Sequence, residues 1–533
     1  MNKILMHIIC LMFCLIPLNS YSEEAPALFK PVQGQVRVQA IGSKLEQQTV
    51  VRERVMAVDF SLLPGPAGKT GRRASQEEGH ADGSAKGLAN SRLKLNLFED
   101  LAVTLVIDEI RDESPDGATI SIIGHLEGFP GSQAILVSSG SILAGNLSLP
   151  GYGLFHIRYL GDNNHAIRQI DQRGYPREKD PANPQIKEND LSVATDEQSS
   201  SEAESAESAD DPPGSSADES GSVIDAMVVY TPAARAAVGG TNAMIALIDL
   251  AVTETNTGYS NSGIVQRINL VHRAEVSYTE ATFDDPFDIA LDDLTGTSDG
   301  KMDNVHTMRD DYGADMVSLF IDDTTWCGLA WIMTDESHDF QDHAFSVVHW
   351  DCATGYYSFA HEMGHNQGGK HDRPTDNSDG VFSYSHGYQD PEGDFRTIMS
   401  YDCPGGCTRV NYWSNPDIDY VDGGINYGPM GVVYTASDSA DMRRSHNFTR
   451  DTVANWRPRY VYVDKDWTGT ETGLSANPFN TISEGVDKIG RFATGARLYI
   501  TPGFYSGSGN YPLIITKPMT IYPWGSGAIT IVP

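Results

Sequence analysis

Residues 361–371 read HEMGHNQGGKH, which places three histidines and one glutamate at a spacing that builds a metal site. On a helix, His361 and His365 share one face, so both imidazoles reach one metal while Glu362 lies beside them. The glycine three residues after His365 can take the positive φ that ends a helix, and we expect His371 to approach from another direction. Three protein ligands leave a fourth position for water, which is typical of a catalytic zinc site.

A second motif, TIMSY, begins at Thr397, and its methionine lies 28 residues after His371. It resembles the Met-turn of the metzincin metallopeptidases, in which a methionine packs beneath the metal-binding histidines. The resemblance gives this role to Met399, although an isolated methionine would indicate only core packing. It also places Tyr401 near the zinc, as in astacin-like and serralysin-like members, where the tyrosine ligates the metal or stabilises the reacting substrate.

Residues 360–372, AHEMGHNQGGKHD, are similar to the reprolysin (adamalysin) pattern, in which Asp follows the third ligand. The Met-turn departs from that family, which usually has Pro at the position of Tyr401. The HD ending, the MSY turn and the following CTRVNYWSNPD are more similar to reprolysin-like bacterial enzymes near the peptidyl-Asp metallopeptidases. The resemblance covers roughly residues 222–458 and implies zinc binding and peptide hydrolysis.

The first 22 residues form a pattern typical of a secretory signal peptide: Lys3, an apolar run over 4–18, and small residues at Ser20 and Ser22. A lipoprotein anchor at Cys14 is the alternative, but a Phe precedes this cysteine where a small residue is expected. No other stretch approaches the roughly 20 apolar residues that span a bilayer. We therefore expect a secreted, soluble protein.

The formal net charge of −34 argues against nucleic acid and anionic membranes as partners. We expect protein or peptide substrates and a monomer. Part of the charge is local, because residues 188–221 hold eleven acidic residues and no Lys or Arg. This segment has few large apolar residues, so it predicts a disordered linker.

A chain of 533 residues exceeds one hydrophobic core. Residues 23–187 contain runs such as RLKLNLF and TISIIGHL, which predict a mostly β domain. Its place before the catalytic region resembles a propeptide; the alternative is a substrate- or carbohydrate-binding domain kept in the mature protein. No cysteine lies between Cys14 and Cys327, so latency would come from another zinc ligand or from steric occlusion.

Residues 222–457 alternate strands such as VIDAMVVY with helical patterns over 242–255, 287–294 and 302–312. With the resemblance, this predicts an α+β (α/β) metzincin catalytic domain with its zinc helix over 354–367. The run CGLAWIM falls where metzincins place the edge strand that pairs antiparallel with a substrate.

Residues 458–533 contain short strands such as ARLYITPGFY and resemble the opening turns of a right-handed parallel β-helix. So few rungs cannot bury a face alone. We expect this region either to dock on the protease or to begin a longer domain.

Four cysteines remain after signal removal, and an even number in an exported chain predicts two disulfides. Cys403 and Cys407 are close enough to pair, which leaves Cys327 for Cys352. The alternative, a second metal site using these thiols, lacks a finger or ribbon spacing.

Two further groups have structural alternatives to a functional role. Four acidic loop residues suggest a calcium site or simply a solvated loop: Asp322, Asp323, Asp335 and Asp339. Four histidines lack a partner at ligand spacing and are expected to be structural or at the surface: His338, His343, His349 and His386.

The sequence thus predicts a zinc metalloendopeptidase made as a zymogen, with Glu362 as general base and Tyr401 donating to the oxyanion. Arg409 lies in the segment after the Met-turn, where a guanidinium would favour a substrate carboxylate. Alternatively, Arg409 faces solvent or pairs with Asp402 or Asp417. Rival functions are an inactive metzincin-fold adhesion or binding module and a metal-dependent hydrolase of non-peptide substrates.

Overall fold

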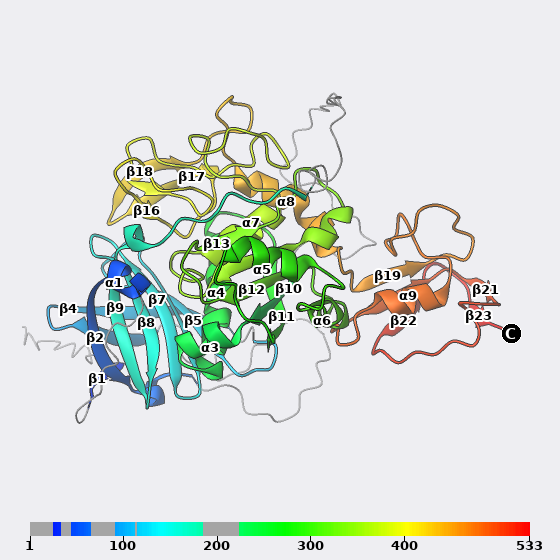
Figure 1. The fold of residues 1–533 in the computed structure, drawn as a ribbon, viewed down its shortest axis with the longest axis horizontal. Helices are drawn as coiled ribbons and strands as arrows, with labels where there is room; N and C mark the ends of the chain where they lie inside the picture. The colour runs from blue at the N-terminus through cyan, green and yellow to red at the C-terminus, as the bar shows by residue number, and fades with distance from the viewer. Residues whose placement is uncertain (1–24, 33–43, 65–90, 112–113, 185–222) are drawn as a thin grey trace, which may run out of the picture.

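The computed structural model describes residues 25–32, 44–64, 91–111, 114–184 and 223–533. The predicted signal peptide, 1–22, and the predicted linker, 188–221, lie outside these residues. Three parts follow one another along the described chain: a large β-sheet domain, a mixed α/β domain and a smaller C-terminal region (Figure 1).

The N-terminal domain is one nine-stranded sheet, and neighbouring strands pair antiparallel in the order β1-β2-β9-β8-β7-β6-β5-β4-β3. Its two edges meet, because the Leu28 N–H donates to the Lys94 carbonyl and the Lys94 N–H donates to the Pro26 carbonyl, both at 2.9 Å. These bonds close the sheet at one point, and its inward side chains fill one apolar core. The strands are β1 (Phe29–Pro31), β2 (Val50–Val58), β3 (Arg92–Phe98), β4 (Leu101–Arg111), β5 (Ile120–Leu126), β6 (Gln133–Ser139), β7 (Ile142–Leu149), β8 (Gly153–Gly161) and β9 (Asn164–Ile170), and α1 (Lys44–Thr49) precedes β2.

Strand β6 is buried on both faces. Leu136 belongs to the core inside the closed sheet, whereas its neighbours Ile135 and Val137 belong to the core of the α/β domain. Successive side chains point to opposite faces of a strand, so one strand contributes to two cores. The N-terminal domain is therefore docked on the α/β domain through an apolar surface.

The α/β domain is built on a five-stranded sheet in the order β11-β10-β12-β14-β13, and only β13, at one edge, runs antiparallel to its neighbour. The run CGLAWIM thus contains an edge strand, as its sequence predicts. The strands are β10 (Val223–Tyr230), β11 (Arg267–Glu275), β12 (Met316–Ile321), β13 (Gly328–Ala330) and β14 (Phe345–His349).

The helices of this domain are α3 (Pro232–Val238), α4 (Thr241–Asn261), α5 (Pro286–Thr295), α6 (Asn304–Tyr312), α7 (Ser358–Asn366) and α8 (Met442–Ala454). Short strand pairs follow α7, namely β15 (Phe395–Arg396) with β16 (Thr408–Arg409) and β17 (Asn415–Asp422) with β18 (Ile425–Met430). Helix α4 is buried along most of its length, because the α/β sheet covers one side and the N-terminal sheet the other.

Helix α7 is shorter than the sequence predicts. The expected start at residue 354 is wrong, because Tyr357 takes a left-handed conformation (φ 64°) and the helix begins at Ser358. At the other end Gly368 has φ +90°, which confirms its expected role in ending the helix. Both predicted disulfides, Cys327–Cys352 and Cys403–Cys407, are confirmed.

The C-terminal region has a small apolar core of its own. Its strands pair in parallel, as β19-β20-β22 and as β21-β23, and the region contacts the α/β domain through the Phe492 N–H, which donates to the Asp311 carbonyl at 2.6 Å. The β-helix stays a prediction. The elements are β19 (Tyr460–Val463), α9 (Ile482–Lys488), β20 (Arg497–Ile500), β21 (Gly503–Tyr505), β22 (Thr520–Pro523) and β23 (Ile529–Ile531).

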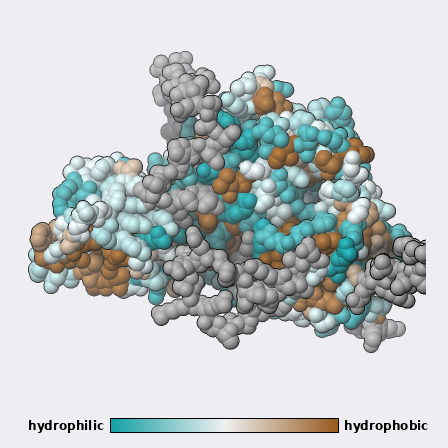
Figure 2. All heavy atoms as spheres, turned by 180° about the vertical axis from the view of Figure 1, so that it is seen from behind, coloured by the Kyte–Doolittle hydropathy of each residue, from teal (hydrophilic) through white to brown (hydrophobic). Residues whose placement is uncertain are grey.

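Apolar surface is exposed at the outer end of this region (Figure 2). It includes Phe504 and Ile514, which are 73% and 75% exposed. Among the described residues no single helix is long and apolar enough to cross a membrane, and α3 with α4 meets that test only as a pair bent by 91°.

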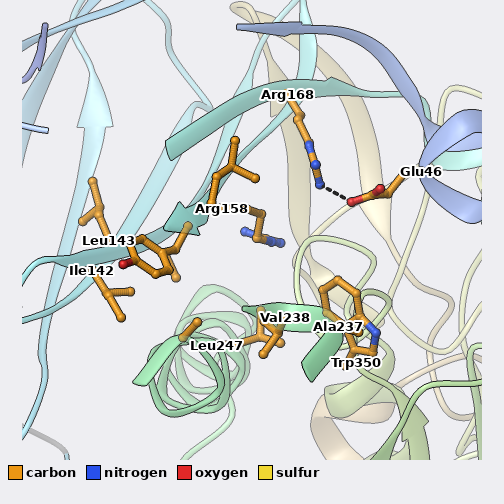
Figure 3. A pocket seen from close by; sticks show the side chains of 13 residues that line it. Glu46, Ile142, Leu143, Arg158, Arg168, Ala237, Val238, Leu247 and Trp350 are labelled. Atoms are coloured by element: carbon orange, nitrogen blue, oxygen red, sulfur yellow. Dashed lines mark ion pairs between the residues drawn. The ribbon is translucent and has the colours of Figure 1, made fainter. Parts of the chain in front are cut away.

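A cavity of about 50 Å³ lies where the N-terminal sheet meets α3 and α4 (Figure 3). On one side of it Arg168 of β9 forms an ion pair with the carboxylate of Glu46 at 2.7 Å, while Leu247 of α4 lines the opposite side. No residue of α7 lines this cavity, so it belongs to the domain interface and not to the histidine site.

Candidate active site

The three predicted histidine ligands converge on one point. His361 and His365 lie one turn apart on α7, and His371 follows the turn after it. Their Nε2 atoms lie 3.1 Å apart for His361 and His371, 3.1 Å for His361 and His365, and 3.2 Å for His365 and His371. Among the described residues, this is the one group of metal-ligating side chains that could hold an ion.

Hydrogen bonds fix the ring tautomers of two of the three histidines. The Nδ1 of His361 lies 2.8 Å from the Ile398 carbonyl, and the Nδ1 of His365 lies 2.7 Å from the Gly369 carbonyl. A carbonyl only accepts, so Nδ1 carries the proton and each Nε2 lone pair faces the shared centre. Burial lowers the pKa of His361 to about 4 and those of His365 and His371 well below the usual value, which favours the neutral, ligating form.

The donor set fits a zinc ion. Imidazole nitrogens bind zinc at about 2.0–2.1 Å, and nitrogens on one face of a tetrahedron of that size lie a little over 3 Å apart. The nitrogens of the triad have this spacing, and lone pairs that face one another without a proton between them need a cation. The hydrogen-bonded Nδ1 atoms are the outer support that zinc-binding histidines ordinarily have.

Glu362 lies beside the triad with both carboxylate oxygens buried and without a hydrogen-bond partner among the described residues. Burial, and then the negative charge of Glu178, raise the pKa of Glu362 well above its usual value. The carboxylate also lies against β13, since a Cβ added to Gly328 would be 2.2 Å from its Oε1. A buried, unpartnered carboxylate at this position is suited to exchange a proton with a reacting group.

Met399 lies beneath α7, the helix that carries His361 and His365. It is fully buried, and a Cβ added to Gly364 would be 2.5 Å from its Sδ and 2.8 Å from the Trp413 ring. The glycine inside HEMGH therefore lets the methionine and the indole approach the helix between the two histidines. In the sequence, the glycine inside HEMGH is the only indication of this close approach. The spacing of the histidines does not indicate it.

Tyr401 packs its ring on His371, with ring centroids 4.1 Å apart. Its hydroxyl donates to the backbone carbonyl of Glu178 at 2.7 Å, and it lies 3.1 Å from Asp180 Oδ1. Burial raises the pKa of this hydroxyl, so it stays protonated and able to donate. The Asp372 side chain accepts a hydrogen bond from the Tyr401 N–H.

Arg409 is buried next to the site and neither faces solvent nor pairs with Asp402 or Asp417. Its guanidinium forms a two-pronged ion pair with Glu178 of the N-terminal part: Nη1 contacts Oε1, and Nη2 lies 2.8 Å from Oε2. It also donates to the carbonyls of Tyr356, at 3.0 Å, and Ser400, at 2.9 Å. Against the opposing effect of burial, the charge of Arg409 holds the pKa of Glu178 well below its usual range.

Residues 177–182, which follow the N-terminal sheet, run along the edge strand β13. The Cys327 N–H donates to the Arg177 carbonyl at 3.0 Å, and the Lys179 N–H donates to the Gly328 carbonyl at 2.9 Å. Further along, Ala182 forms a parallel bridge with Trp331. The N-terminal part of the chain therefore occupies the edge where a substrate backbone would pair.

Sequence reasoning missed several residues of this site. Asp372 was used only as a family marker, although its place after the third histidine could have indicated a supporting role. The sequence gives no indication that Glu178 contacts Arg409, since the two residues lie 231 positions apart. Ser358, whose hydroxyl donates to Glu178 Oε1 at 2.9 Å, is equally inconspicuous.

The remaining predicted groups lie elsewhere. His386 is buried, and its Nδ1 lies 2.8 Å from the His371 carbonyl, so it supports the backbone of a ligand. His338, His343 and His349 are not part of the triad. Within the described residues, the four acidic loop residues form no group able to hold an ion, so calcium has no support.

Comparison with known proteins identifies the family. Residues 221–428 match the model described as metallo-peptidase family M12B, reprolysin-like. A peptidyl-Asp metalloendopeptidase of Stenotrophomonas maltophilia (strain R551-3) is 37% identical over 353 residues, covering 64% of this chain and 75% of that protein. The chain belongs to the reprolysin-like metallopeptidases. This confirms the resemblance that the motifs indicate.

Two further relatives of this reprolysin-like metallopeptidase are also peptidyl-Asp metalloendopeptidases. One, from Xanthomonas campestris pv. campestris, is 38% identical over 309 residues, covering 58% of this chain and 67% of that protein. Another, from Pseudomonas fragi, is 38% identical over 168 residues, covering 31% of this chain and 85% of that protein. Family membership makes the protein a metalloendopeptidase acting on peptides or proteins, and it implies zinc as the metal.

Proposed function

We propose that the protein is a secreted zinc metalloendopeptidase, made as a zymogen, in which His361, His365 and His371 hold the metal and Glu362 is the general base. The observation that carries this proposal is the convergence of three Nε2 atoms, 3.1–3.2 Å apart, beside a buried carboxylate that has no hydrogen-bond partner among the described residues. An adhesion module has no need of such a carboxylate, whose burial is costly.

Each residue of the site has a separate role in the proposed reaction. When bound, zinc polarises the scissile carbonyl and acidifies a water molecule. Glu362 accepts the proton of that water and delivers it to the departing amine. Tyr401 donates a hydrogen bond from its hydroxyl to the carbonyl oxygen as negative charge develops there. The edge of β13 holds the substrate backbone through main-chain hydrogen bonds.

We infer a preference for an acidic side chain directly after the scissile bond. Arg409 is buried, carries a fixed positive charge, and already holds a carboxylate with both arms of its guanidinium. This geometry selects a carboxylate over an apolar side chain. The relatives named peptidyl-Asp metalloendopeptidases support the same preference.

Secretion and latency are proposed from the order of the parts. Residues 1–22 are the signal peptide, 23–187 the propeptide, 188–221 the linker, 222–457 the protease, and 458–533 a partial right-handed β-helix-like region. The docking of the N-terminal domain and the passage of residues 177–182 along β13 support the propeptide role. Parallel pairing of β19, β20 and β22 supports the last assignment.

Metal analysis tests this function. The purified enzyme should contain one zinc per chain, lose casein hydrolysis with 1,10-phenanthroline, and regain it on addition of zinc. A His365→Ala variant should bind less zinc. Undiminished proteolysis in a fully chelated, metal-free preparation would refute the proposal.

A further inference from the structure

The carboxylate of Glu178 is buried, and both of its oxygens accept hydrogen bonds. Arg409 holds both oxygens, and the Ser358 hydroxyl, at the first residue of α7, donates to Oε1 at 2.9 Å. The Tyr356 ring lies against the guanidinium, 4.3 Å from its centre. The side chains of Glu178 and Arg409 are both 0% exposed, so water does not compete for this ion pair.

The same residue also engages the site through its backbone. The Glu178 carbonyl accepts the hydrogen bond of the Tyr401 hydroxyl at 2.7 Å. That hydroxyl is the group proposed to donate to the substrate oxyanion. Glu178 therefore binds Arg409 through its side chain and the Tyr401 hydroxyl, beside the histidine triad, through its backbone carbonyl.

The direction of the segment explains why it is not a substrate. Residues 177–182 run parallel to β13, as the bridge between Ala182 and Trp331 shows. A substrate is expected to pair antiparallel with this strand. A chain that runs in the opposite direction presents its carbonyl and amide groups to β13 in the reverse order. It therefore occupies the edge of β13 without placing a peptide bond where it could be hydrolysed.

Neighbouring contacts hold the segment in place. The Lys179 ammonium lies 2.7 Å from Asp285 and 2.6 Å from Asp288, both at the start of α5. Gln172, just before the segment, accepts a hydrogen bond from the Arg409 N–H at 2.8 Å. Lys179 and Gln172 belong to the N-terminal part, so these contacts are lost when that part is removed.

We propose that Glu178 is an internal stand-in for the acidic side chain of the substrate, which keeps the enzyme latent by occupying the pocket formed by Arg409 and Ser358 from a reversed strand. Latency then needs neither a cysteine nor any other zinc ligand from the N-terminal part. Removal of that part frees a buried guanidinium, whose charge an acidic peptide side chain neutralises. This inference rests on the proposed function and adds its regulation.

The test compares three full-length proteins, isolated uncut: wild type, Glu178→Gln, and Lys179→Ala. The control, Lys179→Ala, loosens the same segment without touching the pocket. We expect the uncut Glu178→Gln protein to hydrolyse an acidic reporter peptide at least tenfold faster than uncut wild type, and Lys179→Ala to stay within about threefold. After linker cleavage and removal of the N-terminal part, all three contain the same catalytic chain and should have equal rates.

Uncut Glu178→Gln that is as latent as wild type, yet active once cut, would overturn the inference. Cut wild type without activity on any peptide would instead overturn the proposed function. If Glu178→Gln does not fold, two synthetic peptides of residues 175–182, one with the native sequence and one with the Glu178→Gln substitution, are added to cut wild-type enzyme. The native peptide should inhibit competitively and the substituted peptide at least tenfold more weakly, whereas equal inhibition would overturn the inference.

Discussion

The carboxylate of Asp372 accepts a hydrogen bond from the backbone N–H of Tyr401, with Oδ1 and the nitrogen 2.7 Å apart. Its other oxygen accepts from the Thr375 hydroxyl at 2.9 Å. The residue directly after the third histidine thus fixes the backbone at Tyr401. This bond joins two motifs that lie 29 residues apart in the chain.

Replacing Asp372 should therefore disturb Tyr401. Asp372→Ala leaves a buried N–H without an acceptor, which costs about 1–3 kcal/mol. We expect a lower melting temperature and a fall in kcat of at least tenfold, with zinc content maintained. Asp372→Asn keeps an acceptor oxygen and should lose much less, as thermal unfolding and peptide kinetics would reveal. Equal behaviour of the two variants would argue against this positioning role.

Glu362→Gln removes the proton acceptor and leaves the three histidines intact. Because general acid–base catalysis contributes about 100- to 10,000-fold, we expect kcat to fall within that range. Zinc content, measured by atomic absorption, should equal that of wild type. Appreciable casein cleavage by this variant would contradict the role of Glu362.

Arg409→Ala should change which bonds are cut. In a peptide-library digest, the cut wild-type enzyme is expected to favour Asp or Glu directly after the scissile bond, and the variant should lose this enrichment. Because a two-pronged charged pair is lost, kcat/KM for acidic peptides should fall at least tenfold, while that for neutral peptides changes little. A wild-type preference for large apolar residues at this position would exclude the pocket role.

The N-terminus of the active secreted enzyme should lie between residues 188 and 225, as mass spectrometry of the intact protein would determine. An acidic linker without Lys or Arg offers a trypsin-like protease only flanking sites such as Lys187. Full activity in an uncut chain starting near Glu23 would contradict the zymogen.

Release of the cleaved N-terminal part should depend on pH through Glu254 of α4. Burial raises its pKa from 4.5 to about 7, against the opposing bonds from Asn146 and the Gly355 N–H and the charge of Arg158. The N-terminal sheet covers this part of α4, so its departure exposes Glu254 to water and should return the pKa toward 4.5, although Asn146 and Arg158, which lower the pKa, leave as well. The docked state therefore binds more protons between about pH 4.5 and 7, and docking weakens as the pH rises through this window.

Burial also raises the pKa of Asp249, on α4, to about 6, against the opposing charge of Arg273. Its titration therefore also weakens docking as the pH rises. Size-exclusion chromatography of the cleaved complex should show tighter association at pH 5 than at pH 8. Glu254→Gln should flatten this dependence. Tighter association at pH 8 would show that the sign is wrong.

The metal site could be predicted because its geometry is mostly local. Residues four apart on a helix share a face whatever surrounds them, and Gly368 ends the helix through its own backbone freedom. The same holds for the short disulfide loop between Cys403 and Cys407. The strands within VIDAMVVY and CGLAWIM could also be predicted, the first from its nearly continuous apolar run and the second from the family resemblance.

Other features depended on partners far away in the chain. The apolar stripe of α4 predicts a helix with one buried face, yet the N-terminal sheet buries its other face as well. The start of α7 was misplaced, because Tyr357 takes a left-handed conformation that its residue type does not indicate.

The sequence by itself indicated the family, the histidine triad and the glutamate beside it, since these follow from spacing within one short segment, and it predicted both disulfides. Only the tertiary structure decided what Arg409 binds. The sequence does not indicate which group the guanidinium of Arg409 contacts. Its partner Glu178 lies 231 residues earlier in the chain, just after the nine-stranded sheet. Long-range packing buries both charges together, and burial without a partner would be too costly for either.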